Sequence, residues 1–310
     1  MQVGKPIRLG LVGIGKIARD QHIPALRADP AFEIVATASR DGEIDGVPAH
    51  RNISELLAGG HRLDAVSLCT PAAGRYVVAK AAIAAGLGVM VEKPPAATLS
   101  EAEDLGRLAV AQGVTLFTSW HSREAAGVDR ARDLLKQYRI KSVHISWKED
   151  IRRWHPGQDW ILDEGGFGVF DPGINALAIL TRLMPDRVLV DFASIVVPQG
   201  RRSPVAATLG MHAGGTAIAA EFDFLQTGPQ MWAIDVETDN GALRLSDGGA
   251  TLQSGNGPPS TAPNDEYPRL YRRFAEMVAN GTSDVDLTPL RLVQDALLIA
   301  RRIEGPIFNW

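Results

Sequence analysis

Residues 7–120 carry the pattern that most narrows the fold, because short apolar runs alternate there with segments of helical periodicity. The runs show no polar alternation, which indicates strands that are buried on both faces of a sheet. Strands and helices in this order form a parallel sheet with right-handed crossovers. We therefore predict an α/β Rossmann domain at residues 1–123. The expected strands are Ile7–Val12, Glu33–Ala38, Asp64–Leu68, Gly88–Val91 and Thr115–Trp120, and the expected helices are Lys16–Leu26, Ser54–Leu57, Arg75–Ala85 and Ser100–Ala111.

Short capping signals place the last of these helices. Ser100 followed by Glu103 matches a capping box, in which both side chains satisfy amide groups at a helix N-terminus. Gly113 follows the same segment and matches a C-terminal cap.

After about residue 123 the pattern changes to apolar and polar residues in alternation. This alternation predicts an α+β domain at residues 124–310 with an open, mainly antiparallel sheet. Helices are expected at residues 128–138 and after Pro172, and residues 254–268 are expected to form an irregular loop. The last helix can pack back on the first domain. The expected strands are Lys141–Asp150, Leu189–Val197, Ala206–Met211, Ala217–Phe224, Trp232–Glu237 and Ala242–Leu245, and the closing helices are Leu270–Asn280 and Pro289–Ile303.

The composition excludes several classes of protein. With 310 residues, 45% apolar and 22% charged, the chain is typical of a soluble protein of two domains. No apolar run reaches the length of a membrane helix, and the N-terminus lacks the order of a signal peptide. The single cysteine, Cys69, excludes an intrachain disulfide, and a net charge of −4 without basic clusters argues against nucleic-acid binding. We expect a cytoplasmic protein with a small-molecule substrate.

A glycine-containing loop, GIGKIA at residues 13–18, lies between the first expected strand and the first helix. The first glycine permits a tight turn, and the second lets main-chain amides approach a pyrophosphate. The helix N-terminus adds a partial positive charge. We therefore expect the loop to bind a dinucleotide rather than to serve only as a turn, through Gly13, Ile14, Gly15, Lys16 and Ile17.

The residues after the second strand bear on the type of dinucleotide. A carboxylate that holds the ribose of NAD is expected there, but the chain has Ser39 and Arg40 instead. An arginine can pair with the 2′-phosphate of NADP. We therefore favour NADP, with NAD as the alternative if Arg40 is only a solvated surface residue.

Three further motifs follow in the chain: DAVSLCTP at residues 64–71, VEKP at 91–94 and GGFGVFDPGIN at 165–175. Together with the glycine loop they resemble the glucose–fructose oxidoreductase/inositol dehydrogenase (Gfo/Idh/MocA) family, and the resemblance extends over the whole chain. It implies a nicotinamide-dependent oxidoreductase.

Within that family the chain most resembles bacterial aldose 1-dehydrogenases that act on L-arabinose and D-galactose. The stretches that carry this likeness are GIGKIARDQH, EKPPAATL, WHSRE, WKEDIRRWHPGQDWI and VFDPGINAL. The resemblance implies oxidation of L-arabinose, D-galactose or D-fucose at C1 to the lactone. Because the open sheet of the family often forms a subunit interface, it also implies a homo-oligomer, a dimer or larger.

The resemblance gives Lys93 and Asp171 catalytic roles. Lys93 follows a buried strand at the edge where open α/β sheets bind ligands, and its ammonium can stabilise charge on the sugar oxygen. The structural alternatives are that Lys93 is only a surface lysine and that Asp171 is only the N-cap of a helix. The family usually has a histidine four residues after this aspartate, where this chain has Asn175. The resemblance favours Asp171 as the base and Asn175 as a sugar-binding residue, and leaves open whether Asp171 or Lys93 takes the proton.

The remaining candidates come from the same motifs. Cofactor contacts are expected from Thr70, Pro71, Glu92 and Lys93, although Glu92 can equally belong to a salt bridge. Arg75 stands where the family usually has a histidine, and the sequence assigns it no role. A pyranose stacks on aromatic rings and needs hydrogen-bond partners, so sugar contacts are expected from His121, Glu149, Trp154 and His155. Trp160 and Trp232 are expected in the core. We expect no metal, because the histidine spacing fits no standard zinc pattern and hydride transfer needs none.

Two alternative functions stay open. A relative that oxidises a ring hydroxyl, as in inositol, would not form a lactone. A non-catalytic NADP-sensing regulator on the same fold is the other, since fold does not fix function. Such a regulator has no need of Lys93, Asp171 and Asn175 together, which weighs against it.

Overall fold

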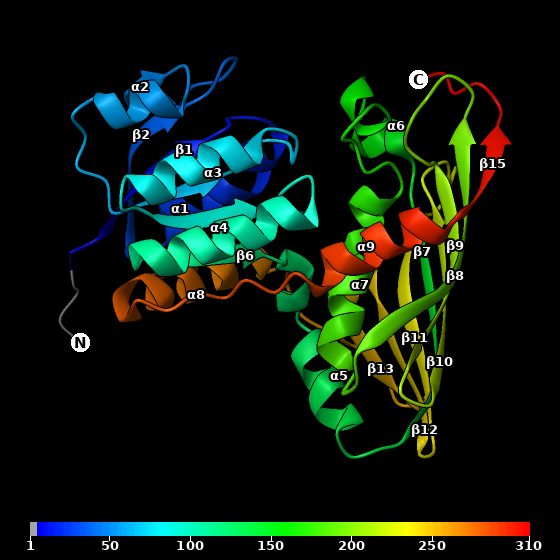
Figure 1. Ribbon diagram of the computed structural model, residues 1–310. Coiled ribbons are helices and arrows are strands. Elements are labelled where there is room, and N and C mark those ends of the chain that lie inside the picture. The colour runs from blue at the N-terminus through cyan, green and yellow to red at the C-terminus, as the bar shows by residue number, and fades with distance from the viewer. Residues whose placement is uncertain (1–4) are drawn as a thin grey trace. The chain divides into compact units, whose positions relative to one another are not determined.

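The computed structural model describes residues 5–310, which fold into two compact units (Figure 1). Unit 1 contains the chain up to Trp120 together with Tyr267–Leu287, and unit 2 contains His121–Glu266 and Thr288–Trp310. The first unit therefore ends near the expected boundary after residue 123. Residues 267–287 return to unit 1 and contain the second-to-last helix of the chain. The last helix belongs to unit 2.

Within residues 5–310, the sheet of unit 1 has six strands, all parallel, in the order β3-β2-β1-β4-β5-β6. The order reverses between β1 and β4, and ligands bind at the carboxyl ends of the strands at such a point. The prediction of a Rossmann domain is confirmed. The strands are β1 (Ile7–Val12), β2 (Phe32–Ala38), β3 (Ala49–His50), β4 (Ala65–Leu68), β5 (Gly88–Glu92) and β6 (Leu116–Ser119).

Helices cover both faces of this sheet and form a separate core on each. One core contains Leu11, Tyr271 and Phe274, and the other contains Leu68 and Ala79. The first core is made with α1 and α8, and the second with α2, α3 and α4. The helices are α1 (Ile23–Ala28), α2 (Ile53–Ala58), α3 (Arg75–Ala84), α4 (Leu99–Gln112) and α8 (Glu266–Asn280).

The helix that follows the glycine loop contains a wider turn. A π-helical segment, η1 at Ala18–His22, precedes α1. Pro24 gives the physical reason, because its ring clashes with the carbonyl four residues back and it has no N–H to donate. The wider turn contains His22, whose side chain is fully buried.

The N-terminus of α4 differs from the prediction. Thr98, not Ser100, is the N-cap, and its hydroxyl accepts a hydrogen bond from the main-chain N–H of Glu101 at 3.2 Å. The Glu101 carboxylate accepts the N–H of Thr98 in return, which completes a capping box. At the other end Gly113 adopts the left-handed conformation, with φ 63°, as predicted.

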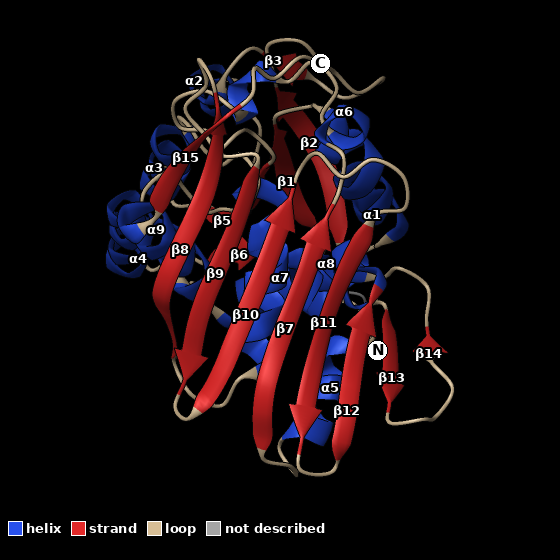
Figure 2. Cartoon of the chain, turned by 90° about the vertical axis from the view of Figure 1, so that its right-hand side faces the viewer, coloured by secondary structure: helices blue, strands red, loops and turns tan. Residues whose placement is uncertain are grey.

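In the described part of unit 2, nine strands form one sheet in the order β14-β13-β12-β11-β7-β10-β9-β8-β15. Only the pairs β7–β10 and β8–β15 are parallel among these strands, which confirms a mainly antiparallel sheet. In Figure 2 the strands lie in front, with α5 and α7 behind them. The strands are β7 (Ile140–Lys148), β8 (Val188–Pro198), β9 (Ala206–Ala213), β10 (Thr216–Asp223), β11 (Met231–Thr238), β12 (Gly241–Ser246), β13 (Thr251–Ser254), β14 (Ser260–Thr261) and β15 (Arg301–Gly305), and the helices are α5 (Val128–Leu135), α6 (Ile151–Trp154), α7 (Phe170–Leu183) and α9 (Thr288–Ile299).

Three further local predictions are wrong. The last helix ends at Ile299 rather than at residue 303, because residues 301–305 pair with β8 as β15. This strand is mostly exposed, so it lacks the apolar alternation that marks a strand in the sequence. The expected loop at residues 254–268 contains β14 and the start of α8. Trp160 is 40% exposed and does not belong to the core.

Candidate active site

The glycine loop lies at the carboxyl end of β1. Gly13 has φ 90°, and a side chain there would place its Cβ about 3.0 Å from atoms of Cys69 and Thr70. A Cβ at Gly15 would meet nothing within 4 Å, so the main chain is open there. The N–H of Ile14 donates to the Ser39 hydroxyl at 3.2 Å, which ties the loop to the end of β2. These features suit a loop that receives a pyrophosphate next to a helix N-terminus.

Ser39 and Arg40, which are expected to contact the ribose of the cofactor, also lie beside this loop. Ser39 is engaged by the loop, and Arg40 is exposed. Across residues 5–310 the Arg40 side chain has no hydrogen bond or ion pair. Lys16 pairs with Asp20 one helical turn away. The fork of Arg40 donors is thus available to an anion.

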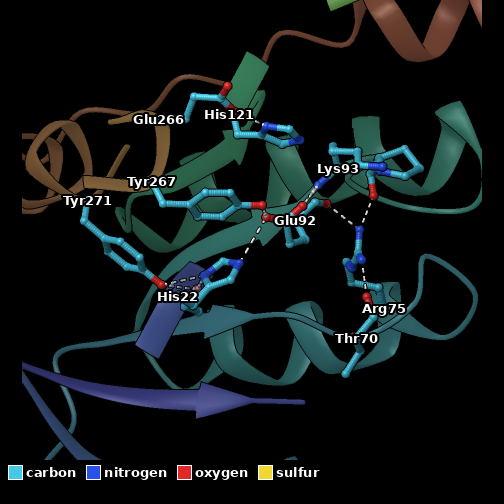
Figure 3. Close-up of polar contacts among 11 residues, drawn as sticks. His22, Thr70, Arg75, Glu92, Lys93, His121, Glu266, Tyr267 and Tyr271 are labelled. Atoms are coloured by element: carbon cyan, nitrogen blue, oxygen red, sulfur yellow. Dashed lines mark hydrogen bonds and ion pairs between the residues drawn. The ribbon is translucent and has the colours of Figure 1, made fainter. Parts of the chain in front are cut away.

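Arg75, to which the sequence assigned no role, is 3% exposed. Its guanidinium donates to three main-chain carbonyls, those of Thr70, Glu92 and Pro94 (Figure 3). It therefore joins the segment after β4 to the segment after β5. The hydroxyl oxygen of Thr70 is buried and has no hydrogen-bond partner among the described residues.

The carboxylate of Glu92 lies inside unit 1 and is 4% exposed. One oxygen accepts the main-chain N–H of Lys93 at 2.8 Å. The other accepts the Tyr267 hydroxyl at 2.8 Å and lies 3.1 Å from Nε2 of His22 (Figure 3). Both oxygens are therefore bound by groups of the chain itself, although the sequence had suggested a contact with the cofactor.

His22 connects this carboxylate to a second tyrosine. Its Nδ1 lies 2.7 Å from the Tyr271 hydroxyl, which donates to Ser67 at 3.0 Å. Burial opposes charge on the His22 ring, but interactions with Cys69, Tyr271 and Glu92 outweigh it and raise its pKa well above the ordinary value. Burial raises the pKa of Tyr271 to about 12.

No motif in the sequence marks His22, Tyr267 or Tyr271 as functional. A lone histidine on a helix is usually plain packing, so His22 gave no functional signal. The two tyrosines are four residues apart, which places them on one face of α8. This spacing could have indicated that the two tyrosines act together. The residues that they contact, His22 and Glu92, lie far away in the sequence, so the sequence does not show what the face packs against.

In unit 2, Asp171 lies in the first turn of α7 and is 9% exposed. The turn before it needs glycine at position 168, where φ is 53° and a Cβ would lie 2.1 Å from the carbonyl oxygen of Pro204. Nε2 of His155 lies 3.5 Å from the Asp171 carboxylate. Asn175 is half-buried and one helical turn further along α7. The structure thus brings three of the predicted residues together.

The other predicted sugar-binding residues, Glu149, Trp154 and His121, lie in two separate groups of contacts. The indole N–H of Trp232 donates to the Glu149 carboxylate at 2.7 Å, and Glu149 is 7% exposed. The Trp154 ring meets the Trp232 ring edge to face, with centroids 5.6 Å apart. His121 lies in the second group, where its Nδ1 is 2.5 Å from the Glu266 carboxylate (Figure 3).

Residues 5–310 contain no group of three or more histidine, cysteine, aspartate or glutamate side chains placed to hold a metal ion. Within the same range no helix is long and apolar enough to span a membrane.

Unit 1 has the topology, the glycine loop and the lysine at a strand end that define a dinucleotide-dependent oxidoreductase. Residues 7–119 match the family model of an oxidoreductase family with an NAD-binding Rossmann fold. Galactose 1-dehydrogenase from Pseudomonas fluorescens is 41% identical, over 98% of this chain and 99% of that protein. The chain therefore belongs to the Gfo/Idh/MocA family of oxidoreductases, as the motifs indicated.

Solved structures show the same relationship. The crystal structure of a D-galactose-1-dehydrogenase from Rhizobium etli superposes with a TM-score of 0.95 at 49% identity, over 100% of both chains. A 3-ketoreductase from Actinomadura kijaniata, in complex with NADP and TDP-benzene, has a TM-score of 0.83 at 23% identity, over 97% of this chain and 100% of that one. At that identity the second likeness concerns the fold alone.

Proposed function

We propose that the chain is an NAD(P)-dependent aldose 1-dehydrogenase that oxidises D-galactose, L-arabinose and D-fucose at C1 to the lactone. The observation that carries the proposal is similarity along the full length to two galactose 1-dehydrogenases, at 41% and 49% identity. A likeness that includes unit 2 supports the substrate class as well as the cofactor, because the predicted sugar-binding residues lie in unit 2.

The reaction removes a hydride from C1 and a proton from the C1 hydroxyl, and a C=O bond forms. NAD(P)⁺, when bound at residues 13–17 with Thr70 and Pro71 nearby, supplies the hydride acceptor. The Lys93 ammonium orients the C1 oxygen and stabilises the charge that develops on it. The Asp171 carboxylate accepts the proton, since the amide of Asn175 cannot.

The polar groups around Asp171 support this division of roles. His155 lies 3.5 Å from its carboxylate and, when protonated, favours the charged form that a base requires. The Asn175 amide can donate to one sugar hydroxyl and accept from another. Trp154 offers an aromatic face to the apolar side of a pyranose, while Glu149 and His121 are further polar contacts.

We infer a preference for NADP over NAD. Arg40 is exposed, is unengaged within residues 5–310 and follows the strand whose end meets the adenosine ribose in this fold. Its fork of donors fits a 2′-phosphate, and the carboxylate that would favour NAD is missing from this position.

We also infer that the enzyme is a homo-oligomer assembled through the sheet of unit 2, and that it is cytoplasmic. The support is apolar exposure on an edge of that sheet. Leu189 and Phe192 on β8 are 41% and 57% exposed, and Ile303 on β15 is 42% exposed. Exposed apolar side chains grouped on one surface are typical of a protein interface.

The test is an initial-rate assay of nicotinamide reduction with a panel of sugars, followed by detection of the lactone. D-Galactose, L-arabinose and D-fucose share their C1–C4 configuration and differ in the C5 substituent, so all three should react within about two orders of magnitude in kcat/KM. D-Glucose should be poor, because inversion at C4 leaves buried polar groups unpaired, at about 1–3 kcal/mol each. Faster turnover of D-glucose or myo-inositol than of D-galactose and L-arabinose would contradict the proposal, and a product other than a lactone would favour ring-hydroxyl oxidation.

A further inference from the structure

The main chain around Lys93 is held by two buried side chains. The Glu92 carboxylate accepts the N–H of Lys93 at 2.8 Å. The Arg75 guanidinium donates to the carbonyls on both sides of Lys93, those of Glu92 and Pro94.

Each of the two holding groups is fixed in turn. Arg75 begins α3, and its third acceptor is the carbonyl of Thr70, which immediately precedes Pro71. Glu92 is fixed by Tyr267 at 2.8 Å and by His22 at 3.1 Å. The planar fork of an arginine can serve three separate acceptors in a fixed geometry, whereas a lysine ammonium is a compact point charge.

We propose that Arg75 and Glu92 form a clamp that positions the Lys93 ammonium for catalysis by fixing the main chain on both sides of it. This inference rests on the proposed role of Lys93 in aldose oxidation. It gives Glu92 a role that acts through Lys93 in place of a contact with the cofactor. It also gives Arg75 a role, at a position where the sequence indicated none.

The geometry explains why a main-chain clamp matters for a lysine. Four methylene groups separate the ammonium from Cα, so a small rotation of the main chain moves the charged group by a larger distance. A displacement of about 1 Å in a catalytic group can lower the rate about a hundredfold. The clamp contacts neither the glycine loop nor the end of β2, where the pyrophosphate and the adenosine ribose are expected to bind, and its one contact near the cofactor is with the main-chain carbonyl of Thr70. Its loss should therefore lower kcat more than it weakens cofactor binding.

The experiment is a double-mutant cycle between Arg75→Met and Lys93→Ala, measured on the full chain with D-galactose and NADP. Arg75→Met should lower kcat about 10- to 100-fold while the Kd for NADP changes less than about threefold. In the Lys93→Ala background the same substitution should change kcat less than about twofold, because the group that it positions is gone. Arg107→Met is the matched control, since Arg107 lies on α4 with its side chain 77% exposed, and it should leave kcat unchanged.

Two conservative variants keep the test decisive if Arg75→Met folds poorly. Arg75→Lys retains the charge and should recover only part of kcat. Glu92→Gln keeps an acceptor for the Lys93 N–H and should retain more activity than Glu92→Ala. Equal losses of kcat from Arg75→Met with and without Lys93 would overturn the clamp, as would normal kcat in Arg75→Met. If Lys93→Ala alone leaves kcat unchanged, Lys93 has no catalytic role and the clamp is overturned with it. If the wild type does not oxidise D-galactose, the proposed function fails instead.

Discussion

At the scale of single residues, the proposed chemistry depends on one carboxylate. Asp171→Asn preserves the shape of the side chain but removes the base, so kcat should fall by about two to four orders of magnitude. KM should change little, because the amide can still accept a hydrogen bond from the sugar. Steady-state kinetics with D-galactose measures both constants. Turnover close to that of the wild type in a folded Asp171→Asn protein would remove Asp171 from the mechanism and leave Lys93 as the proton acceptor.

A second residue, Arg40, sets the expected cofactor preference. A charge-assisted hydrogen bond contributes about 1.5–3 kcal/mol, so Arg40→Ala should raise the Kd for NADP about 10- to 100-fold. Binding of NAD should stay nearly constant, because NAD has no 2′-phosphate. Calorimetric titration with each cofactor separates the two effects. Equal weakening for both cofactors would mean that Arg40 does not contact the 2′-phosphate.

The place of a residue in the fold could be predicted where a motif determines the local chain geometry. The glycine loop lies at the carboxyl end of β1 and Asp171 lies in the first turn of α7, as their motifs indicate, while their roles stay predictions. Glu92 shows the limit. The sequence places it correctly at the end of β5, but its orientation depends on Tyr267, which is distant in the chain.

At the scale of secondary-structure elements, the start of α4 offers a direct comparison of two capping candidates. Thr98 with Glu101 and Ser100 with Glu103 have the same spacing, so the sequence alone cannot distinguish them. Thr98→Ala should lower the free energy of unfolding by about 1 kcal/mol, the usual cost of a lost N-cap. Ser100→Ala, the matched control, should stay within about 0.5 kcal/mol of the wild type. Urea denaturation measures both. The reverse order of effects would restore Ser100 as the cap.

The buried contact between η1 and α8 predicts a pH dependence of stability. The folded-state pKa of His22 is raised, so above about pH 6.5, the ordinary value, the folded state binds more protons than the unfolded state. Its contribution is therefore complete below that pH and is lost as pH rises through the folded pKa. The urea midpoint of the wild type should fall over this alkaline range more steeply than that of His22→Gln.

A further variant checks that this pH slope comes from the buried cluster. His144 lies on the exposed sheet of unit 2 and its side chain is 47% exposed, so His144→Gln should keep the slope of the wild type. Identical slopes in the wild type and His22→Gln would show that His22 is not protonated in the folded state.

Helices and strands could be predicted from the sequence where their apolar residues repeat at a constant spacing along the element. Most strands of both sheets satisfy this condition, and their bounds agree with the prediction to within a few residues. Strands β3, β13, β14 and β15 do not, because they are short or mostly exposed. The wider turn at η1 was also missed, since a proline near a helix start normally signals only an ordinary first turn.

At the scale of the whole molecule, the exposed apolar residues of β8 predict the oligomeric state. Phe192 lies over Gly210 of β9, where a Cβ would be only 1.9 Å from its ring. The double substitution Leu189→Ser and Phe192→Ser removes apolar surface without changing net charge and should dissociate the oligomer. Sedimentation velocity gives the mass. Val110→Ser is the control, because Val110 on α4 is 81% exposed and belongs to unit 1. A monomeric wild type would contradict the prediction.

The division of the chain into units was only partly visible in the sequence. The change from unbroken apolar runs to alternation marks the end of the first α/β segment near residue 120. The return of residues 267–287 has no such mark, because an amphipathic helix does not reveal which sheet it will cover.

That return has a consequence for how the protein is made. Synthesis on the ribosome runs from the N-terminus, so all strands of the nucleotide-binding sheet emerge before α8 exists. Until then one face of the sheet lacks Leu270, Tyr271 and Phe274, which are fully buried in the finished protein. Glu92 meanwhile lacks the hydroxyl of Tyr267. The nascent chain must therefore carry an uncovered apolar face while eight of the nine strands of the second sheet, β7 to β14, are translated. During this interval a chaperone has a surface to bind.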